Sequence, residues 1–201
     1  AQDARNGRKV GLGFASQAVG QFFGTNGNLK IGPQLGWSFE LPVTSQISFL
    51  LEPMYIPKGS RTVNHSIKTR DVISLHYLEL PLMLKISTNP DPQGLFLTGG
   101  LMYGYFLSGR EKHYEYGDLE SNVKFDPSET NRSEWSAGLG IGYEKGDWMW
   151  EFRAESSLSV FDPLVQSHNV VYSIQVAWRL PTKGEHARHR QGSSDPDGGS
   201  E

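Results

Sequence analysis

The stretch from residue 29 to residue 41 reads LKIGPQLGWSFEL, and every second residue in it, from Leu29 to Leu41, is apolar. Lys30, Glu40 and small or polar residues stand between them. Successive side chains of a β-strand leave opposite faces, so a period of two predicts a strand with one apolar face. An apolar face of this length favours a strand that crosses a bilayer, which takes about 9–11 tilted residues.

Six further stretches repeat this alternation and one shows it more loosely, so the sequence predicts eight strands. The six lie near residues 47–55, 77–86, 95–107, 134–144, 148–160 and 170–180, and the looser one near 10–14. After the first turn the connections alternate between short and long, as in outer-membrane barrels with short periplasmic turns. Polar connections are expected at 57–71 and 109–131. We therefore predict an all-β fold, an eight-stranded antiparallel up-and-down transmembrane barrel over residues 1–180. A disordered polar tail is expected at 181–201, because its composition is rich in Gly, Ser and Asp.

The composition excludes several classes of protein. The formal net charge of −3 gives no basis for nucleic-acid binding. The chain has no cysteine, which excludes thiol catalysis, disulfides and thiolate metal sites. No apolar run is long enough for a transmembrane helix. The chain begins Ala1-Gln2-Asp3, which we interpret as the product of signal-peptide removal, with simple trimming as the other interpretation.

A soluble lipocalin-like barrel is the alternative fold, with an apolar cavity and a polar exterior. The length of the apolar faces favours the membrane barrel. Aromatic residues near the strand ends also favour it, because membrane barrels carry two aromatic girdles at headgroup depth. The residues are Trp37, Phe39, Tyr55, Tyr103, Tyr105, Trp135, Tyr143, Trp148 and Trp178.

The polar faces of the strands carry charges that would point into the lumen. We expect a structural charge network there, made of Glu52, Glu79, Lys85, Glu151, Arg153, Glu155 and Arg179. Glu52 and Glu79 are expected to approach each other from neighbouring strands. An eight-stranded barrel is only wide enough for its own side chains, and buried charges must be paired. We therefore interpret the network as a salt-bridged plug without an open pore, rather than as a proton or ion path.

Prolines and glycines interrupt the pattern. Pro33, Pro53 and Pro81 lie inside predicted strands, where they predict bulges or breaks in the hydrogen-bond ladder. Alternate glycines at 138, 140 and 142 lack the strand-to-helix context of a nucleotide-binding loop. They are expected to leave room in the lumen for large neighbours, such as an opposing Arg or Tyr.

Two motifs resemble a known family. The sequence YLELPLMLK at 77–85, followed by GGLMYGY at 99–105, resembles the PorT-type outer-membrane β-barrel family, as does LEPMY at 51–55. The resemblance implies a small barrel in the outer membrane of a Gram-negative cell. It also implies a link to protein export machinery, although most relatives have no assigned activity.

Function is less constrained than fold. We expect a structural or interaction and assembly role, no enzymatic activity, and no cofactor or metal. The expected partners are outer-membrane lipid and other envelope proteins, which would bind through extracellular loops such as 109–131, with Tyr114 and Tyr116. The same residues are equally suited to extend the neighbouring strands above the membrane. A lipid-modifying hydrolase is the alternative. Its candidate residues are Ser74 with His76, His113, and His168 beside Asp162 and Ser167.

Overall fold

The computed structural model describes residues 4–19, 28–64, 66, 68–90, 93–125, 132–159 and 167–180 of the 201-residue chain. Ten antiparallel strands account for nearly all of them. Their bounds are β1 (Arg5–Val19), β2 (Lys30–Pro42), β3 (Ile47–Leu51), β4 (Met54–Asn64), β5 (Thr69–Ser87), β6 (Gln93–Glu115), β7 (Asp118–Lys124), β8 (Ser133–Lys145), β9 (Trp148–Ser157) and β10 (Ser167–Arg179). Within the described part of the chain, no helix has the length and apolar character needed to cross a membrane.

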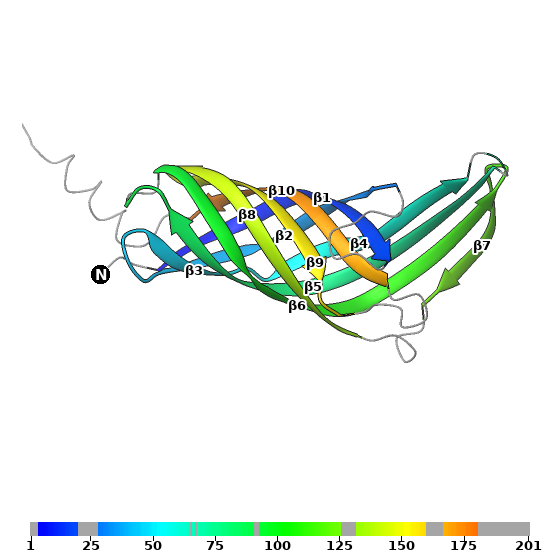
Figure 1. The fold of residues 1–201 in the computed structure, drawn as a ribbon, viewed down its shortest axis with the longest axis horizontal. Helices are drawn as coiled ribbons and strands as arrows, with labels where there is room; N and C mark the ends of the chain where they lie inside the picture. Colours follow the sequence, from blue (N-terminus) through cyan, green and yellow to red (C-terminus); the bar gives the residue numbers. More distant parts are fainter. Residues whose placement is uncertain are drawn as a thin grey trace, which may run out of the picture.

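The strands close into a barrel (Figure 1). Most neighbours in sequence pair with each other, and β6 pairs with β8. β1 pairs with β10 from Gly7↔Arg179 to Val19↔Ser167, which joins the two ends of the sheet. β3 and β4 both pair with β2 and with β5, so they are two halves of one barrel strand. β7 pairs with the far end of β6 and adds no strand to the barrel wall. The prediction of an eight-stranded antiparallel barrel is confirmed.

Of the irregularities predicted at three prolines, the one at Pro53 occurs as a break in the ladder, whereas Pro33 and Pro81 lie within the continuous strands β2 and β5. β3 ends at Leu51 and β4 begins at Met54, so Glu52 and Pro53 lie between the halves of the strand. Backbone hydrogen bonds still cross the break, because Trp37 N donates to the Pro53 carbonyl at 3.1 Å and Glu52 N donates to the Pro81 carbonyl at 3.0 Å.

β2 and β4 separate on the loop side of this break. Only Leu35↔Tyr55 and Gly36↔Met54 pair between the two strands. Pro33, two residues before Leu35 in β2, pairs with Leu12 of β1 and has no partner in β4. The missing N–H of proline is therefore tolerated where the ladder on that side is already open.

Apolar side chains cover the outside of the barrel. In β2 the exposed positions are Ile31, Pro33, Leu35, Trp37, Phe39 and Leu41, and the residues between them face the lumen. Aromatic rings gather at both ends of this surface. Near the short turns, Trp148 stacks on Trp150 and Trp178, with Tyr143 beside Trp150; near the other end, Tyr103 packs on Trp135.

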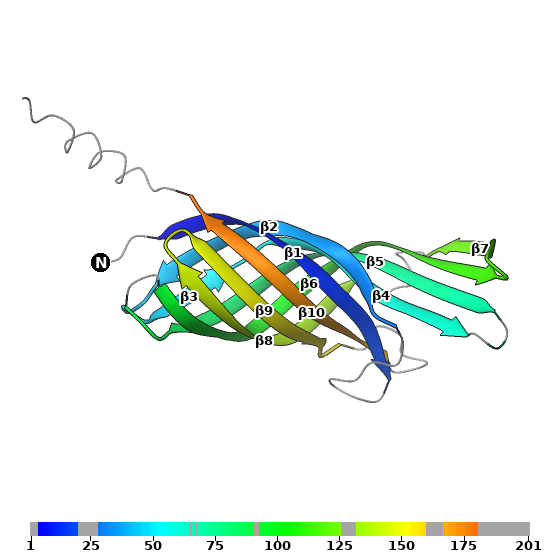
Figure 2. The ribbon, with the colours of Figure 1, turned by 90° about the horizontal axis from the view of Figure 1, so that it is seen from above.

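Four strands continue beyond the barrel on one side (Figure 2). This extension, here called the extended sheet, consists of residues 59–64 of β4, 69–74 of β5, 110–115 of β6 and 118–124 of β7. We expected polar connections at 57–71 and 109–131, and the structure corrects both, since most of these residues are strand. For 109–131 we also considered that the neighbouring strands extend above the membrane, and the structure supports this alternative.

The short turns lie at the opposite end of the barrel, at 43–46, at 146–147 and between β5 and β6. In outer-membrane barrels such turns face the periplasm, so the extended sheet lies on the extracellular side. The tail predicted at 181–201 lies outside the described residues, as do His186 and His189 within it.

Candidate functional site

Charged side chains fill the lumen in three groups along the barrel axis. Proceeding from the short turns towards the extended sheet, they are the lower cluster (Glu40, Lys85, Glu144 and Arg179), the middle cluster (Lys9, Glu52, Glu151 and Arg153) and the upper cluster (Lys58, Glu79, Glu134 and Glu155). Every one of these residues is buried. Apart from Glu52 in the break and Lys58 in the fully buried part of β4, each side chain comes from the polar face of a strand whose other face is apolar and exposed, so the alternation in sequence directs it inward.

The lower cluster is a ring of alternating charges. Lys85 Nζ lies 3.0 Å from Glu40 and 2.6 Å from Glu144, and Arg179 Nη2 lies 2.7 Å and 2.6 Å from the same two carboxylates. Lys85 also lies over the ring of Phe96, 5.0 Å from its centroid. Two cations and two anions therefore cancel, and each charge is shared between two partners.

The middle cluster repeats this arrangement. Lys9 Nζ lies 2.8 Å from Glu52 and 2.7 Å from Glu151, and Arg153 Nη2 lies 2.6 Å and 2.8 Å from them. Thr98 adds a hydrogen bond of 2.6 Å to Glu151. Removing a charge from water costs several kcal/mol, and the pairing offsets this cost only when the hydrogen bonds are also satisfied. The ring meets that condition and closes the lumen at its centre.

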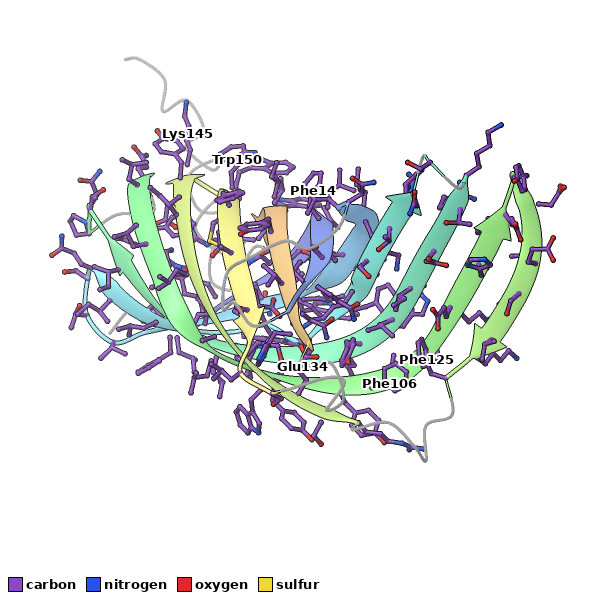
Figure 3. The ribbon with its side chains drawn as sticks, turned by 45° about the vertical axis from the view of Figure 1, so that its right-hand side comes forward. Phe14, Phe106, Phe125, Glu134, Lys145 and Trp150 are labelled. Carbon is purple, nitrogen blue, oxygen red and sulfur yellow. The ribbon has the colours of Figure 1, made fainter. Side chains whose placement is uncertain are left out.

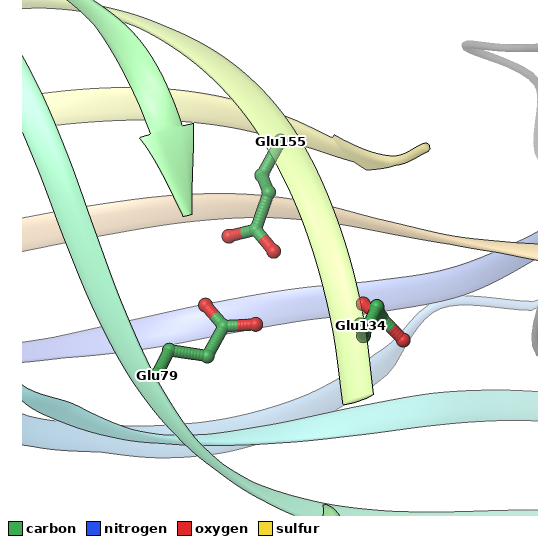
Figure 4. A group of neighbouring side chains, drawn as sticks. All are labelled: Glu79, Glu134 and Glu155. Atoms are coloured by element: carbon green, nitrogen blue, oxygen red, sulfur yellow. The ribbon is translucent and has the colours of Figure 1, made fainter. Parts of the chain in front are cut away.

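The upper cluster differs because one cation, Lys58, contacts three carboxylates. Figure 4 shows the three carboxylates, those of Glu79, Glu134 and Glu155. Lys58 Nζ lies 2.6 Å from Glu134 and 2.7 Å from Glu155, and it also pairs with Glu79. Asn169 donates a further hydrogen bond of 2.7 Å to Glu134. The three carboxylates have oxygens within 4.8 Å of one another, a spacing that could hold a metal ion, but the ammonium of Lys58 already contacts all three. The formal charge of this cluster is −2.

An apolar layer lies above the upper cluster. Leu75, Tyr77 and Phe106 are buried together, with Ile73 and Phe125 packed against them. Figure 3 shows Phe106 and Phe125 side by side where the extended sheet leaves the barrel. β4 adds to this layer, because all five residues from Ile56 to Ser60 are buried instead of alternating. The lumen is therefore packed from its lower end to the base of the extended sheet.

The structure places all seven sequence-predicted network residues in the lumen, although they divide among the three clusters. Glu52 and Glu79 were expected to be neighbours, and this is corrected: Glu52 belongs to the middle cluster and Glu79 to the upper one. The break at Glu52 and Pro53 separates them, because Glu79 pairs with Met54 in the next part of the strand.

Sequence reasoning missed two of the five buried cations. Lys58 was assigned to a polar connection, and the alternation of β1 was too weak to place Lys9. Glu40, Glu134 and Glu144 stood on the polar faces of predicted strands but were not selected for the network. The signal that could have identified Lys9 and Lys58 is charge balance, since the predicted set held more carboxylates than cations.

The glycines of β8 make room for neighbours other than Arg or Tyr, which corrects the expectation. A Cβ at Gly138 would lie 2.3 Å from Met102, and one at Gly142 would lie 2.2 Å from Phe96. At Gly140 it would lie 2.5 Å from the Glu151 carboxylate. These close approaches allow the lumen side chains to fill the interior of a narrow barrel.

The candidate residues of the hydrolase alternative do not form a nucleophile–base pair. The Nδ1 of His76 is hydrogen-bonded to the Tyr55 hydroxyl at 2.5 Å, and no bond to Ser74 is present between these described residues. His168 lies 3.2 Å from the Ser157 carbonyl. His113 is bonded to Asp71 at 2.5 Å on the extended sheet. Asp162, expected near His168, lies outside the described residues.

A family model described as "Outer membrane protein beta-barrel domain" matches residues 1–162 of this chain. The chain belongs to this outer membrane β-barrel family. A membrane location follows for the apolar exterior, and the barrel resides in the outer membrane of a Gram-negative cell. A comparison with curated proteins finds no match.

Solved structures share the fold of this family member. The attachment invasion locus protein Ail of Yersinia pestis, solved in complex with the heparin analogue sucrose octasulfate, matches with a TM-score of 0.53 at 10% identity, covering 89% of this chain and 100% of Ail. Neisserial surface protein A matches with a TM-score of 0.53 at 9% identity and the same coverage of both chains. At such low identity the likeness concerns the fold alone.

Proposed function

We propose that this chain is a non-conducting outer-membrane barrel whose role is structural and interactive: the filled lumen supports the extended sheet, which binds other components of the envelope. The observation that carries the proposal is the sequence of buried layers. Two neutral charge rings, the upper cluster and an apolar layer lie in series across the lumen. An ion moving through would have to separate buried pairs, each of which costs several kcal/mol to break.

Planar-bilayer recordings test the absence of conduction. The full chain, reconstituted in a planar membrane, should give no steady current above that of a protein-free membrane, while an open porin measured in parallel conducts. A reproducible unitary current from the wild-type chain would overturn the non-conducting assignment.

The extended sheet supports the interactive part of the proposal. It continues the barrel wall on the extracellular side and presents β7 as an edge strand in which every residue is exposed. An exposed edge offers unpaired backbone groups to a partner strand. At the tip of this sheet, Tyr116 is 71% exposed.

Photocrosslinking in native membranes tests this role. A photoreactive amino acid at Tyr116 should give protein adducts, whereas the same probe at Leu139, which is 69% exposed on the lipid-facing wall, should not. Equal protein adducts at both positions, or none at Tyr116, would contradict the proposal. The resemblance to the PorT-type family extends the proposal to protein export machinery, and the identity of the adducts decides that extension.

A further inference from the structure

Charges of opposite sign occupy opposite faces of the extended sheet. Residues paired across strands share a face, and successive rows alternate between the two. The outer face consists of the rows Gly59–Ser74–Arg110–Lys124, Arg61–Val72–Lys112–Asn122 and Val63–Arg70–Tyr114–Leu119. The inner face consists of the rows Ser60–Ile73–Glu111–Val123, Thr62–Asp71–His113–Ser121 and Asn64–Thr69–Glu115–Asp118.

In these rows the outer face carries five cations and no carboxylate: Arg61, Arg70, Arg110, Lys112 and Lys124. Glu120 of β7 lies at the register shift and belongs to neither set of rows. The inner face carries four carboxylates and neither Lys nor Arg: Asp71, Glu111, Glu115 and Asp118. Among the described residues, none of the five cations forms an ion pair. Like charges held on one surface without counter-charges repel each other, so the outer face is complementary to an anionic partner.

The outer face is continuous with the lipid-facing wall of the barrel. Along β5 the outward positions run from Leu82, Leu80 and Leu78, which are exposed and apolar, to Ser74 and Arg70. The cations therefore stand directly above the apolar band and face the same side as the lipid. In a membrane, the headgroup layer of the outer leaflet lies beside these cations.

The height of the cations selects the kind of headgroup. The row of Arg110 lies four residues beyond Leu78 along the strand, and the row of Arg70 lies eight residues beyond it. At about 3.3 Å per residue and a tilt of about 40°, these rows stand ~10 Å and ~20 Å above Leu78. A phospholipid headgroup layer is only about 5–8 Å thick on each side of a bilayer. The array therefore suits a thicker headgroup, a saccharide that bears several phosphates.

Arg70 is already oriented for such a ligand. Its guanidinium lies over the Tyr114 ring at 4.0 Å from the centroid. Stacking fixes the plane of the guanidinium, whose fork of N–H donors matches a phosphate bidentately.

We propose that the outer face of the extended sheet binds the phosphorylated saccharide headgroup of an outer-leaflet glycolipid, through Arg61, Arg70, Arg110, Lys112 and Lys124. The inference deepens the proposed function, on which it rests, by naming the partner of one face. The acidic inner face, turned away from the lipid, keeps the sheet from lying down on the anionic membrane surface.

The experiment measures binding of a bis-phosphorylated, short-chain lipopolysaccharide to the full chain in a zwitterionic detergent. Replacing three cations together (Arg110→Gln, Lys112→Gln and Lys124→Gln) should weaken binding on the order of 100-fold at low salt, since each Lys or Arg near an anionic lipid surface contributes about fivefold. The matched control, Glu111→Gln with Glu115→Gln on the inner face, should bind as tightly as wild type or more tightly. Wild-type binding should also weaken with added salt.

Four outcomes would overturn the inference: no binding by the wild-type chain, equal binding after enzymatic removal of the phosphates, equal binding by the triple variant, or tighter binding of the soluble polyanion heparin than of the glycolipid. The gel shift between heated and unheated samples verifies that each variant is a folded barrel. Failure of the binding test is distinguishable from failure of the proposed function. The absence of conduction depends on the lumen clusters, and none of these substitutions changes a residue of those clusters.

Discussion

Lys58 and Glu155 meet across the lumen with 2.7 Å between Nζ and Oε1, although one comes from β4 and the other from β9. This pair belongs to the upper cluster, where a single ammonium also contacts Glu79 and Glu134. Opposite walls of the barrel are thus joined through one side chain.

Removal of that ammonium should destabilise the barrel strongly. The change Lys58→Met leaves three buried carboxylates without a cation, and breaking a buried pair in this way costs about 3–5 kcal/mol of unfolding free energy. Urea titration of the chain in lipid vesicles measures the difference. Lys112→Met, outside the membrane, is the control and should change stability by less than about 0.5 kcal/mol. Equal stability of the two variants would show that the upper cluster is not a structural element.

Charges on the outer wall test the lipid-facing assignment. Leu80→Arg and Leu139→Arg should each lower the unfolding free energy by about 2–4 kcal/mol, the cost of an arginine near the bilayer midplane. Leu119→Arg is the matched control, because Leu119 is 50% exposed on β7, beyond the membrane. The unfolding free energy of the Leu119→Arg variant should stay within about 0.5 kcal/mol of the wild-type value. Urea titration in lipid vesicles measures the unfolding free energy of all three variants. Equal changes in the three variants would place the apolar wall in water.

Packing against the β8 glycines can be tested with a single methyl group. Gly142→Ala brings a Cβ to 2.2 Å from Phe96 and 2.3 Å from the backbone oxygen of Trp150, so one of them must move. Overpacking of this kind costs about 1–3 kcal/mol. Gly99→Ala is the control, since its Cβ would meet only a Leu139 methyl at 3.1 Å. If thermal unfolding in detergent ranks the two variants in the opposite order, the lumen near Phe96 is not filled.

The pair of His113 and Asp71 predicts a pH dependence on the extended sheet. The hydrogen bond from His113 to the Asp71 carboxylate raises the pKa of the imidazole above its ordinary 6.5. A raised folded-state pKa gives a contribution to stability that is complete below about pH 6.5 and is lost as the pH rises through the folded value. NMR titration of His113 should show the raised pKa, and Asp71→Asn should return it towards 6.5. An unchanged midpoint in that variant would exclude Asp71 as the cause.

Much of the barrel could be predicted from sequence because one physical rule governs it. Leu29–Leu41 alternates over its whole length, since lipid requires apolar residues on one face and the lumen requires polar or small residues on the other. Lys58 was not predicted as a lumen residue because β4 departs from that rule: the residues from Ile56 to Ser60 are all buried. The pairing of strands in the extended sheet was not predicted for a related reason: strands with water on both faces show no apolar alternation.

The partners within each cluster could not be read from sequence either. Lys9 and Glu151 lie 142 positions apart and meet only because the barrel closes. Which charges meet depends on strand register and on the break at Pro53, and both are properties of the assembled wall.

Closure of the wall has a consequence for biosynthesis. β1 and β10 hold each other by thirteen residue pairs, yet β10 is the last strand of the barrel to be synthesised. Without β10 the sheet would have two free edges, β1 and β9, whose unpaired amide and carbonyl groups act as templates for aggregation. A truncated product that lacks this one strand therefore exposes both edges at once, and each edge can pair with another copy of the chain.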